Sequence, residues 1–410
     1  MNRGFYTILA AQFFSALADN ALLFAAIALL MGLQVPEWQT PVLQQFFVFS
    51  YIVLAPFVGP FADALPKGKV MFISNAVKFA GCLFMLIGTH PLYAYGVVGI
   101  GAAMYSPAKY GILTEYLPAQ KLVLANGWME GLTVAAIILG AISGGVLVKP
   151  ELANKYLAVF DIPGIESGID TPPEFAISVV LGVYFIAAII NLYIPGVALD
   201  HKLPRKDPLY LLHDFWHCFK LLWRDPLGQV SLAVTTLFWG VGATLRLIVL
   251  AWAAVALKFG LDKATQLTAV VALGIAIGSA IAAKYVKLEK SVRILPIGIA
   301  MGLSLILMIV VSNLYVAIAM LLIIGAFSGF FIVPMNALLQ HRGHLLMGAG
   351  HSIAVQNFNE NMSILAMLGV YAVLDRLGFS VFTVLIIFGL FICGTMAYLY
   401  RRHAQVKVET

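Results

Sequence analysis

Long apolar stretches recur along this chain, from its first residues to Arg401, and short polar segments separate them. A stretch of roughly 20 apolar residues is long enough to cross about 30 Å of bilayer hydrocarbon as an α-helix. We predict twelve such helices, centred near residues 18, 54, 80, 105, 136, 186, 242, 275, 303, 327, 363 and 390. The pattern therefore predicts an all-α membrane protein. A signal peptide would be a single short apolar segment, so none is expected.

Composition and charge agree with lipid as the main solvent. Of the 410 residues, 61% are hydrophobic and 11% are charged, and the mean hydropathy is +0.95, which excludes a soluble globular chain of this length. The net charge of +6 does not indicate nucleic-acid binding, because the basic residues flank the predicted spans. Seventeen of the 25 Lys and Arg residues fall in the connections on one side and five on the other. The excess of positive charge then places both termini in the cytoplasm.

Features of the first half of the chain return in the second half at offsets of 219 to 230 residues, which indicates a duplicated helical bundle. We expect two pseudo-symmetric six-helix bundles, over 1–199 and 227–402. A cytoplasmic linker over 200–226 joins them, and a cytoplasmic tail over 403–410 follows. The matched pairs are Asp19 with Arg246, Pro107 with Pro334, Glu130 with Glu360 and Gly59 with Gly278.

The linker contains an amphipathic segment. Apolar side chains share one helical face and basic or imidazole side chains share the other, which is typical of a helix at a membrane surface. We interpret this helix as a passive tether between the bundles, with lipid sensing as the alternative. The apolar face holds Leu212, Phe215, Trp216, Phe219 and Trp223, and the polar face holds His213, His217, Lys220 and Arg224.

Two six-helix bundles joined by a cytoplasmic loop are the plan of the major facilitator superfamily, and the loop after the second predicted span resembles that superfamily's signature. It holds Gly59, Asp63, Lys67, Gly68 and Lys69, with two more residues before Gly68 than the signature has. The glycine allows close approach to a helix of the other half, and the carboxylate can receive helix N-terminal amides or a basic partner. We therefore expect this segment to gate conformational change. A turn with a capping Asp63 is the simpler alternative.

Ionisable residues inside the predicted spans are the most informative, because each costs at least ~3 kcal/mol unless it has a partner or a water-filled cavity. For Lys78 and Glu130, close to the cytoplasmic ends of their spans, we expect ion pairs or snorkelling. Asp19, Arg246 and Glu360 lie more than two turns inside their spans. Intramembrane charge marks transport pathways, so we assign these three to a functional site. The full set is Asp19, Lys78, Lys109, Glu130, Arg246 and Glu360.

The chemistry of this site suits a zwitterionic ligand held at one depth in a central cavity. A guanidinium can bind a phosphate bidentately and a carboxylate can bind an ammonium, so phosphoethanolamine fits. An apolar lining suits an acyl chain better than a sugar. The alternative is a lipophilic cation exported in exchange for protons, with Asp19 or Glu360 as the proton carrier. The neutral hydrogen-bonding residues assigned to the site are Asn20, Gln356, Asn357 and Asn359.

Five stretches that carry these residues closely resemble the bacterial lysophospholipid transporter family. They are ALADNALLF (16–24), SPAKYGIL (106–113), LFWGVGATLR (237–246), VPMNALLQ (333–340) and AVQNFNEN (354–361). The resemblance implies inward flipping of lysophospholipids, chiefly lysophosphatidylethanolamine, across the Gram-negative inner membrane. Re-acylation by a cytoplasmic-side acyltransferase/acyl-carrier-protein synthetase would follow. We expect the transporter itself to be a monomer.

The same resemblance implies roles for particular residues. Asp19, Arg246 and Glu360 stand at the family's polar cavity positions, and Lys109 stands in its Ser-Pro-Ala-Lys segment. One departure is the external loop over 149–174, which is longer than expected. Access from the outer leaflet is therefore where we expect this chain to differ.

A membrane-embedded acyltransferase is a third hypothesis, from another class. The sequence has no nucleophile elbow, no histidine beside an acid in a catalytic spacing and no metal-ligand cluster, so we expect neither catalysis nor a cofactor or metal. We interpret His344 and His351, before the eleventh span, as interface residues. Cys82, Cys218 and Cys393 lie far apart, without disulfide or metal-ligand spacing.

Overall fold

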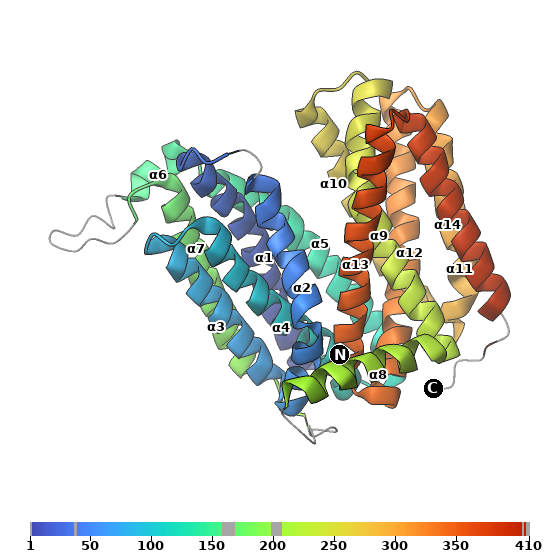
Figure 1. Cartoon of the computed structure of the whole chain (residues 1–410), viewed down its shortest axis with the longest axis horizontal. Coiled ribbons are helices and arrows are strands. Elements are labelled where there is room, and N and C mark those ends of the chain that lie inside the picture. Colours follow the sequence, from blue (N-terminus) through green and yellow to red (C-terminus); the bar gives the residue numbers. More distant parts are fainter. Residues whose placement is uncertain (1, 37–38, 158–168, 198–206, 404–405, 407–410) are drawn as a thin grey trace. The chain divides into compact units, whose positions relative to one another are not determined.

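The computed structural model describes residues 2–36, 39–157, 169–197, 207–403 and 406, and the side chains of residues 261–262 are not included. Over the described residues the chain is helical and contains no strand (Figure 1). The helices are α1 (Arg3–Gly32), α2 (Gln39–Ala64), α3 (Lys67–Leu86), α4 (Pro91–Tyr116), η1 (Ala119–Lys121), α5 (Leu122–Leu147), α6 (Pro150–Leu157), α7 (Pro172–Leu192), α8 (Pro208–Arg224), α9 (Pro226–Ala256), α10 (Leu261–Tyr285), η2 (Leu288–Ile294), α11 (Leu295–Leu307), η3 (Met308–Val310), α12 (Leu314–Met347), α13 (Ala349–Arg376) and α14 (Val381–His403).

The all-α prediction is confirmed, and each predicted span centre lies inside one of these helices. Ten helical segments of the described chain are long and apolar enough to cross a membrane. The other two long helices with predicted centres are α4 and α13, which carry polar residues such as Lys109 and Glu360. The span pattern therefore includes two helices whose polar content suggests a role beyond anchoring.

Two shorter helices complete the set. Helix α8 is the amphipathic helix of the linker, and α6 is a short helix within the predicted external loop. Parts of three predicted segments lie outside the described residues. These parts are 158–168 of the loop, 200–206 of the linker, and 404–405 with 407–410 of the tail, and residues 198–199 at the end of the first predicted bundle are also outside.

Side-chain caps explain where helices α7 and α9 begin. Thr171 and Glu174 form a capping box at the start of α7, and the Asp225 carboxylate accepts a hydrogen bond from the backbone N–H of Gly228 at 2.8 Å. Such caps satisfy backbone N–H groups that the first turn leaves without a helical partner. Both helices also have proline in the first turn, where the missing N–H costs nothing.

The chain folds into two compact units. Unit 1 comprises Met1–Ile112 and Ala135–Phe215, and unit 2 comprises Leu113–Val134 and Trp216–Thr410. The N-terminal half of α5 therefore belongs to unit 2 and its C-terminal half to unit 1. The division into bundles over 1–199 and 227–402 remains a prediction.

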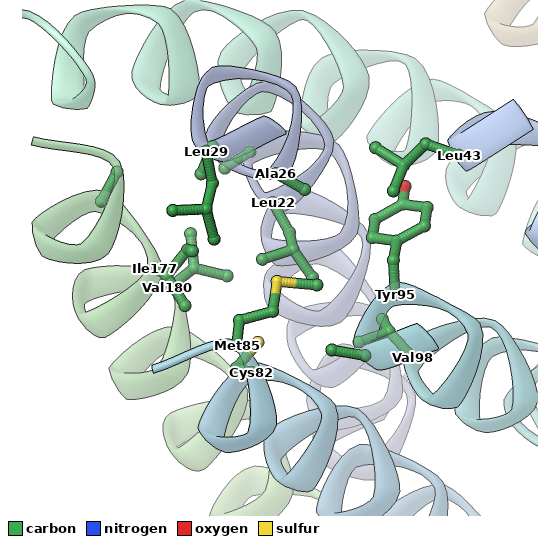
Figure 2. Packing of buried hydrophobic residues seen from close by; sticks show 14 of the residues in the cluster. Leu22, Ala26, Leu29, Leu43, Cys82, Met85, Tyr95, Val98, Ile177 and Val180 are labelled. Atoms are coloured by element: carbon green, nitrogen blue, oxygen red, sulfur yellow. The ribbon is translucent and has the colours of Figure 1, made fainter. Parts of the chain in front are cut away.

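The core of unit 1 is apolar and surrounds α1. Leu22 of α1 is fully buried among side chains of α3, α4 and α7 (Figure 2). Its neighbours in this cluster include Met85 of α3, Val98 of α4 and Val180 of α7. Lipid tails are as apolar as these side chains, so close packing rather than removal from water holds such helices together.

In unit 2, the backbones of helices α10 and α12 are in direct contact. Gly274 and Gly278 of α10, and Gly325 and Gly329 of α12, are each four residues apart and so lie on one helical face. A Cβ atom added at Gly278 would collide with the carbonyl of Ala326. Small residues at this spacing let helices pack closely within lipid. Gly278, which the sequence repeat singled out, is therefore needed for this contact.

We expect Gly278→Ala to lower the free energy of unfolding by about 1–3 kcal/mol, because the new methyl group overpacks the contact with α12. Gly242→Ala in α9 is the matched control, since an added Cβ there meets nothing within 4 Å. That variant should be neutral or more stable by up to ~1 kcal/mol, because alanine favours the helix. Thermal unfolding of both purified proteins in detergent measures the difference. Equal stabilities would contradict the packing argument.

Candidate functional site

The ionisable residues predicted inside the spans are shared equally between the units. Unit 1 is organised around an ion pair and unit 2 around carboxylates joined through amides. Unit 1 holds Asp19, Lys78 and Lys109, and unit 2 holds Glu130, Arg246 and Glu360.

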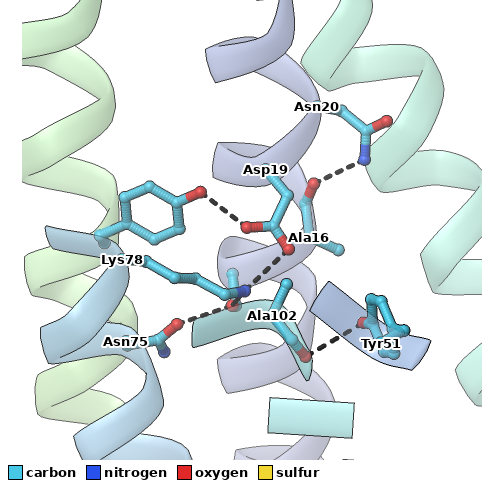
Figure 3. Close-up of polar contacts among 9 residues, drawn as sticks. Ala16, Asp19, Asn20, Tyr51, Asn75, Lys78 and Ala102 are labelled. Atoms are coloured by element: carbon cyan, nitrogen blue, oxygen red, sulfur yellow. Dashed lines mark hydrogen bonds and ion pairs between the residues drawn. The ribbon is translucent and has the colours of Figure 1, made fainter. Parts of the chain in front are cut away.

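Asp19 of α1 forms an ion pair with Lys78 of α3 (Figure 3). The distance from Lys78 Nζ to Asp19 Oδ2 is 2.8 Å. The hydroxyl of Tyr184, from α7, donates a hydrogen bond to Asp19 Oδ1 at 2.6 Å. Both carboxylate oxygens therefore have a donor, although 23% of the Asp19 side chain stays exposed. One carboxylate thus ties three helices of unit 1 together.

Lys78 is buried in the middle of α3 and is 1% exposed. Its ammonium also donates to Ser15 Oγ at 3.1 Å, and it lies 4.7 Å from the centre of the Tyr105 ring and 5.6 Å from that of Tyr184. Of the two expectations for Lys78, pairing is confirmed and snorkelling is wrong. An ammonium this far from the helix end cannot reach water, so it needs partners inside the unit.

The other assigned residues of unit 1 have local contacts. Lys109 of α4 is 9% exposed, and its Nζ lies 4.7 Å from the centre of the Tyr110 ring. Asn20 turns back onto its own helix, where its side-chain N–H donates to the Ala16 carbonyl at 2.8 Å (Figure 3). Their assignment to a binding site remains a prediction.

In unit 2, a chain of amides joins Glu130 to Glu360. Gln356 Nε2 donates to Glu360 Oε1 at 2.7 Å and to Asn336 Oδ1 at 2.9 Å. Asn336 Nδ2 in turn donates to Glu130 Oε1 at 3.3 Å. All four side chains are buried, as is the assigned residue Asn357. The sequence repeat matched the two glutamates as equivalents in separate bundles, whereas the structure places both in one polar network.

A second amide contact joins the same two helices, α5 and α12. Asn126 Nδ2 donates to Gln340 Oε1, and Gln340 Nε2 donates to Asn126 Oδ1, both at 2.8 Å. Asn126 lies one turn before Glu130 on α5, and Gln340 lies one turn after Asn336 on α12. The two contacts therefore form successive rungs between antiparallel helices. Lipid offers no replacement partners, so these amides specify how α5 and α12 align.

Arg246 of α9 is exposed, and within the described part of the chain it makes no hydrogen bond or ion pair. Glu360, on the neighbouring helix α13, is 7% exposed. Its carboxylate forms no ion pair with a basic side chain among the described residues. Unit 2 thus holds a guanidinium open to an anion and a buried carboxyl group whose partners are neutral.

Two contacts establish how α9 and α13 are aligned. Thr235 lies within hydrogen-bonding reach of Glu360, and a Cβ added at Gly240 would collide with Ser363. The helices are therefore parallel. Arg246 is eleven residues beyond Thr235, which places it about 16 Å further along the helix at 1.5 Å per residue. The expectation of one shared depth is wrong for Arg246 and Glu360, because their positions on parallel helices differ by about three turns.

The amphipathic helix α8 packs onto α13 next to Glu360. Trp223 Nε1 donates to Asn359 Oδ1 at 3.3 Å. The rings of Trp216 and Phe219 meet the Phe358 ring edge-on, with centroids 6.1 and 6.2 Å apart. The C-terminal half of α8, which belongs to unit 2, is therefore packed against α13, and a passive tether does not require this contact.

The predicted gating motif over 59–69 lies where α2 ends and α3 begins. Lys67 Nζ donates to Asp63 Oδ1 at 2.8 Å, and both side chains are buried. A Cβ added at Gly68 would lie 2.9 Å from the carbonyl oxygen of Asn191. The glycine thus allows close approach to α7 of its own unit, and Asp63 has a basic partner within the motif. Of the other two motif residues, Gly59 is buried and Lys69 is exposed.

Asp225, at the start of α9, receives a forked contact from Arg342 of α12. Arg342 Nη2 donates to Oδ1 at 2.7 Å and Nε donates to Oδ2 at 2.9 Å. Burial by itself would raise the pKa of Asp225. The hydrogen bonds from Arg342 and from the Gly228 N–H outweigh it and hold the pKa of this carboxyl below its ordinary value. The junction between α8 and α9 is thereby fastened to α12.

Sequence reasoning missed most of the neutral partners in these networks. Hydroxyl and amide side chains are common in membrane helices, so a tyrosine or asparagine alone does not identify a site. Two of the missed residues, Asn336 and Gln340, could have been found, because they fall in the VPMNALLQ stretch that carries the family resemblance. The missed neutral residues are Ser15, Tyr105, Asn126, Tyr184, Asn336 and Gln340, and the charged pair Asp225 and Arg342 was missed as well.

The sequence is similar to a protein family and to named transporters. The family model described as Major Facilitator Superfamily matches residues 8–359. The lysophospholipid transporter LplT of Yersinia enterocolitica is 44% identical over 383 residues, which cover 93% of this chain and 89% of that protein. LplT of Yersinia pestis is 44% identical over 386 residues, which cover 94% and 90%.

Solved structures show the same fold. The major facilitator transporter FucP in its outward conformation has a TM-score of 0.76 with 13% sequence identity, and the match covers 99% of both chains. A human organic anion transporter has a TM-score of 0.72 with 11% identity, covering 98% of this chain and 100% of that one. At such low identity the likeness concerns the fold alone.

We expect Lys78→Met to lower the free energy of unfolding by about 2–3 kcal/mol, because it leaves a carboxylate without its counter-ion. Asp19→Asn should cost a similar amount, and the double variant should cost less than the sum of the two. Lys69→Met, an exposed lysine in the same helix, is the control and should change little. Thermal unfolding in detergent measures all four proteins. Strictly additive losses would show that the pair does not stabilise unit 1.

The pKa of Asp225 is lowered in the folded protein, so its charge stabilises the fold fully above the unfolded pKa and progressively less as the pH falls below it. Asp225→Asn keeps the helix cap but loses the charge. We expect it to be about 1 kcal/mol less stable at neutral pH, and the difference to close below about pH 4. Unfolding curves across this pH range test the prediction, with the exposed Asp375→Asn as control. A constant difference at every pH would contradict it.

Proposed function

We propose that this chain, which belongs to the lysophospholipid transporter family of the major facilitator superfamily, moves lysophospholipids from the outer to the inner leaflet of a bacterial inner membrane. It does so by alternating access, with both termini in the cytoplasm, and lysophosphatidylethanolamine is its chief cargo. The names of its relatives support the substrate class. The transporter acts as a monomer, and its product passes to a cytoplasmic-side acyltransferase/acyl-carrier-protein synthetase for re-acylation.

The observation that carries this proposal is that two ionisable residues deep in the spans of unit 2, Arg246 and Glu360, have no oppositely charged partner among the described residues. Arg246 is exposed and lacks a carboxylate partner among the described residues, so it is available to a phosphate. Glu360 has amide partners and is available to an ammonium. Asp19 is the weaker candidate for the ammonium, because it already has a cationic partner in Lys78.

The two residues lie at different depths along the proposed pathway. Arg246 and Glu360 are separated by about 16 Å along parallel helices. A headgroup moving through unit 2 therefore meets them in succession: its phosphate engages Arg246 at one stage and its ammonium engages Glu360 at another.

A proton-coupled exporter of amphipathic cations is the second candidate. A buried carboxyl group without a basic partner, as at Glu360, is also what a proton carrier needs. The two functions respond differently when the proton gradient is collapsed. Lysophospholipid entry should continue, whereas a proton exchanger should stall.

The decisive experiment measures uptake of labelled lysophosphatidylethanolamine and lysophosphatidylglycerol into vesicles containing the purified protein. Arg246→Gln should reduce uptake of both lipids, because both carry the phosphate. The expected loss of binding free energy is about 2–4 kcal/mol for each lipid. Glu360→Gln should impair lysophosphatidylethanolamine more, because only that headgroup has an ammonium. Arg376→Gln, at the exposed end of α13, is the control and should transport normally.

Two results would contradict the proposal. The first is wild-type protein that transports neither lipid. The second is uptake that stops completely when the proton gradient is collapsed, which would favour the exporter. Equal losses for both lipids in Glu360→Gln would leave the substrate class standing but remove the ammonium role of Glu360.

A further inference from the structure

Helix α8 presents a continuous strip of exposed side chains. Leu209, Leu212 and Trp216 are 74%, 38% and 47% exposed, and Lys220 and Arg224 are also exposed. These positions recur every three or four residues, so they follow one side of the helix for its full length. The strip is apolar towards the start of α8 and basic towards its end. His213 and His217, both exposed, lie along it.

The opposite side of α8 is buried, which settles the direction in which the strip points. Cys218 and Leu222 are 5% and 0% exposed. Trp216 and Trp223, two turns apart along one edge of the strip, contact Phe358 and Asn359 of α13, and the Asp225–Arg342 fork fastens the residue that follows the helix. The strip is therefore a fixed feature of the surface and not the outer side of a loose connection.

The position of α8 brings its basic end to the membrane surface. The helix ends at Arg224, and the membrane-crossing segment Pro226–Ala256 begins two residues later. In its C-terminal half, which belongs to unit 2, helix α8 runs across the ends of the unit 2 helices rather than along them (Figure 1). Lys220 and Arg224 thus lie at the level where lipid phosphates are found, and tryptophan is a residue that favours this level.

We propose that this strip of α8 is a binding surface for anionic phospholipid headgroups. Lys220 and Arg224 contact the phosphates, while Leu209 and Leu212 enter the headgroup region. Charge decides between this occupant and others. Asp214, the acidic residue within α8, is only partly exposed and already engaged, so the strip is basic and would repel a second copy of itself. An apolar side with clustered basic residues beside a membrane span has the composition that anionic lipid surfaces attract.

The test uses the full chain with an environment-sensitive fluorophore on His217→Cys, attached with a membrane-impermeant reagent. Two of the native cysteines, Cys82 and Cys218, are buried and do not compete. The protein in neutral detergent micelles is titrated with phosphatidylglycerol and, separately, with phosphatidylcholine. We expect phosphatidylglycerol to shift the emission to the blue at lower lipid concentration, and added salt to weaken the effect.

Replacing both charges, Lys220→Gln with Arg224→Gln, should raise the apparent Kd for phosphatidylglycerol by roughly tenfold or more. The matched control is Lys287→Gln with Lys290→Gln, which removes the same charge from exposed positions between α10 and α11. It should leave the titration unchanged.

Any of three other results would overturn the proposal. Identical titrations with the two lipids would mean that the apolar residues alone bind lipid. Equal weakening in the control variant would mean that net charge, and not this strip, attracts the lipid. No shift with either lipid would mean that the strip does not face headgroups.

Discussion

An ionisable or amide side chain inside an apolar helix must find a partner within the protein, because lipid supplies none. This requirement organises both units. In unit 1, one carboxylate at Asp19 receives the ammonium of Lys78 and the hydroxyl of Tyr184 and so joins α1, α3 and α7. In unit 2, the rungs at Glu130 and Asn126 align α5 with α12. The polar groups therefore determine which helices meet and in what alignment.

Close packing supplies the attraction that removal from water does not provide within lipid. At Gly278 and Gly68 the backbones approach so closely that a methyl group would not fit without a shift. Such contacts are short-ranged and depend on shape, whereas the hydrogen bonds depend on direction. The two kinds of contact restrict each other, since a helix rotated to improve one would lose the other. The polar residues of each unit are thereby held in defined positions.

The two units use their charges differently, and the proposed function follows from that difference. The charge at Asp19 is neutralised by Lys78 inside unit 1. Unit 2 retains Arg246 and Glu360 without oppositely charged partners among the described residues. Helix α8 contacts α13 at Asn359, the residue before Glu360. The surface proposed to bind anionic lipid is thus attached to the helix proposed to bind the cargo.

Length and hydropathy by themselves determined the helices, because a membrane-spanning helix is a local property of about twenty residues. They also singled out Asp19, Lys78, Glu130, Arg246 and Glu360, since charge in an apolar stretch stands out. Five matching stretches of sequence determined the family. Only the tertiary structure decided which side chains are partners. It joined Lys78 to Asp19, brought Glu130 into the network of Glu360, and set Arg246 about three turns from Glu360. Partner choice depends on the rotation and alignment of whole helices, and a rotation of part of a turn changes every neighbour without altering the hydrophobic pattern.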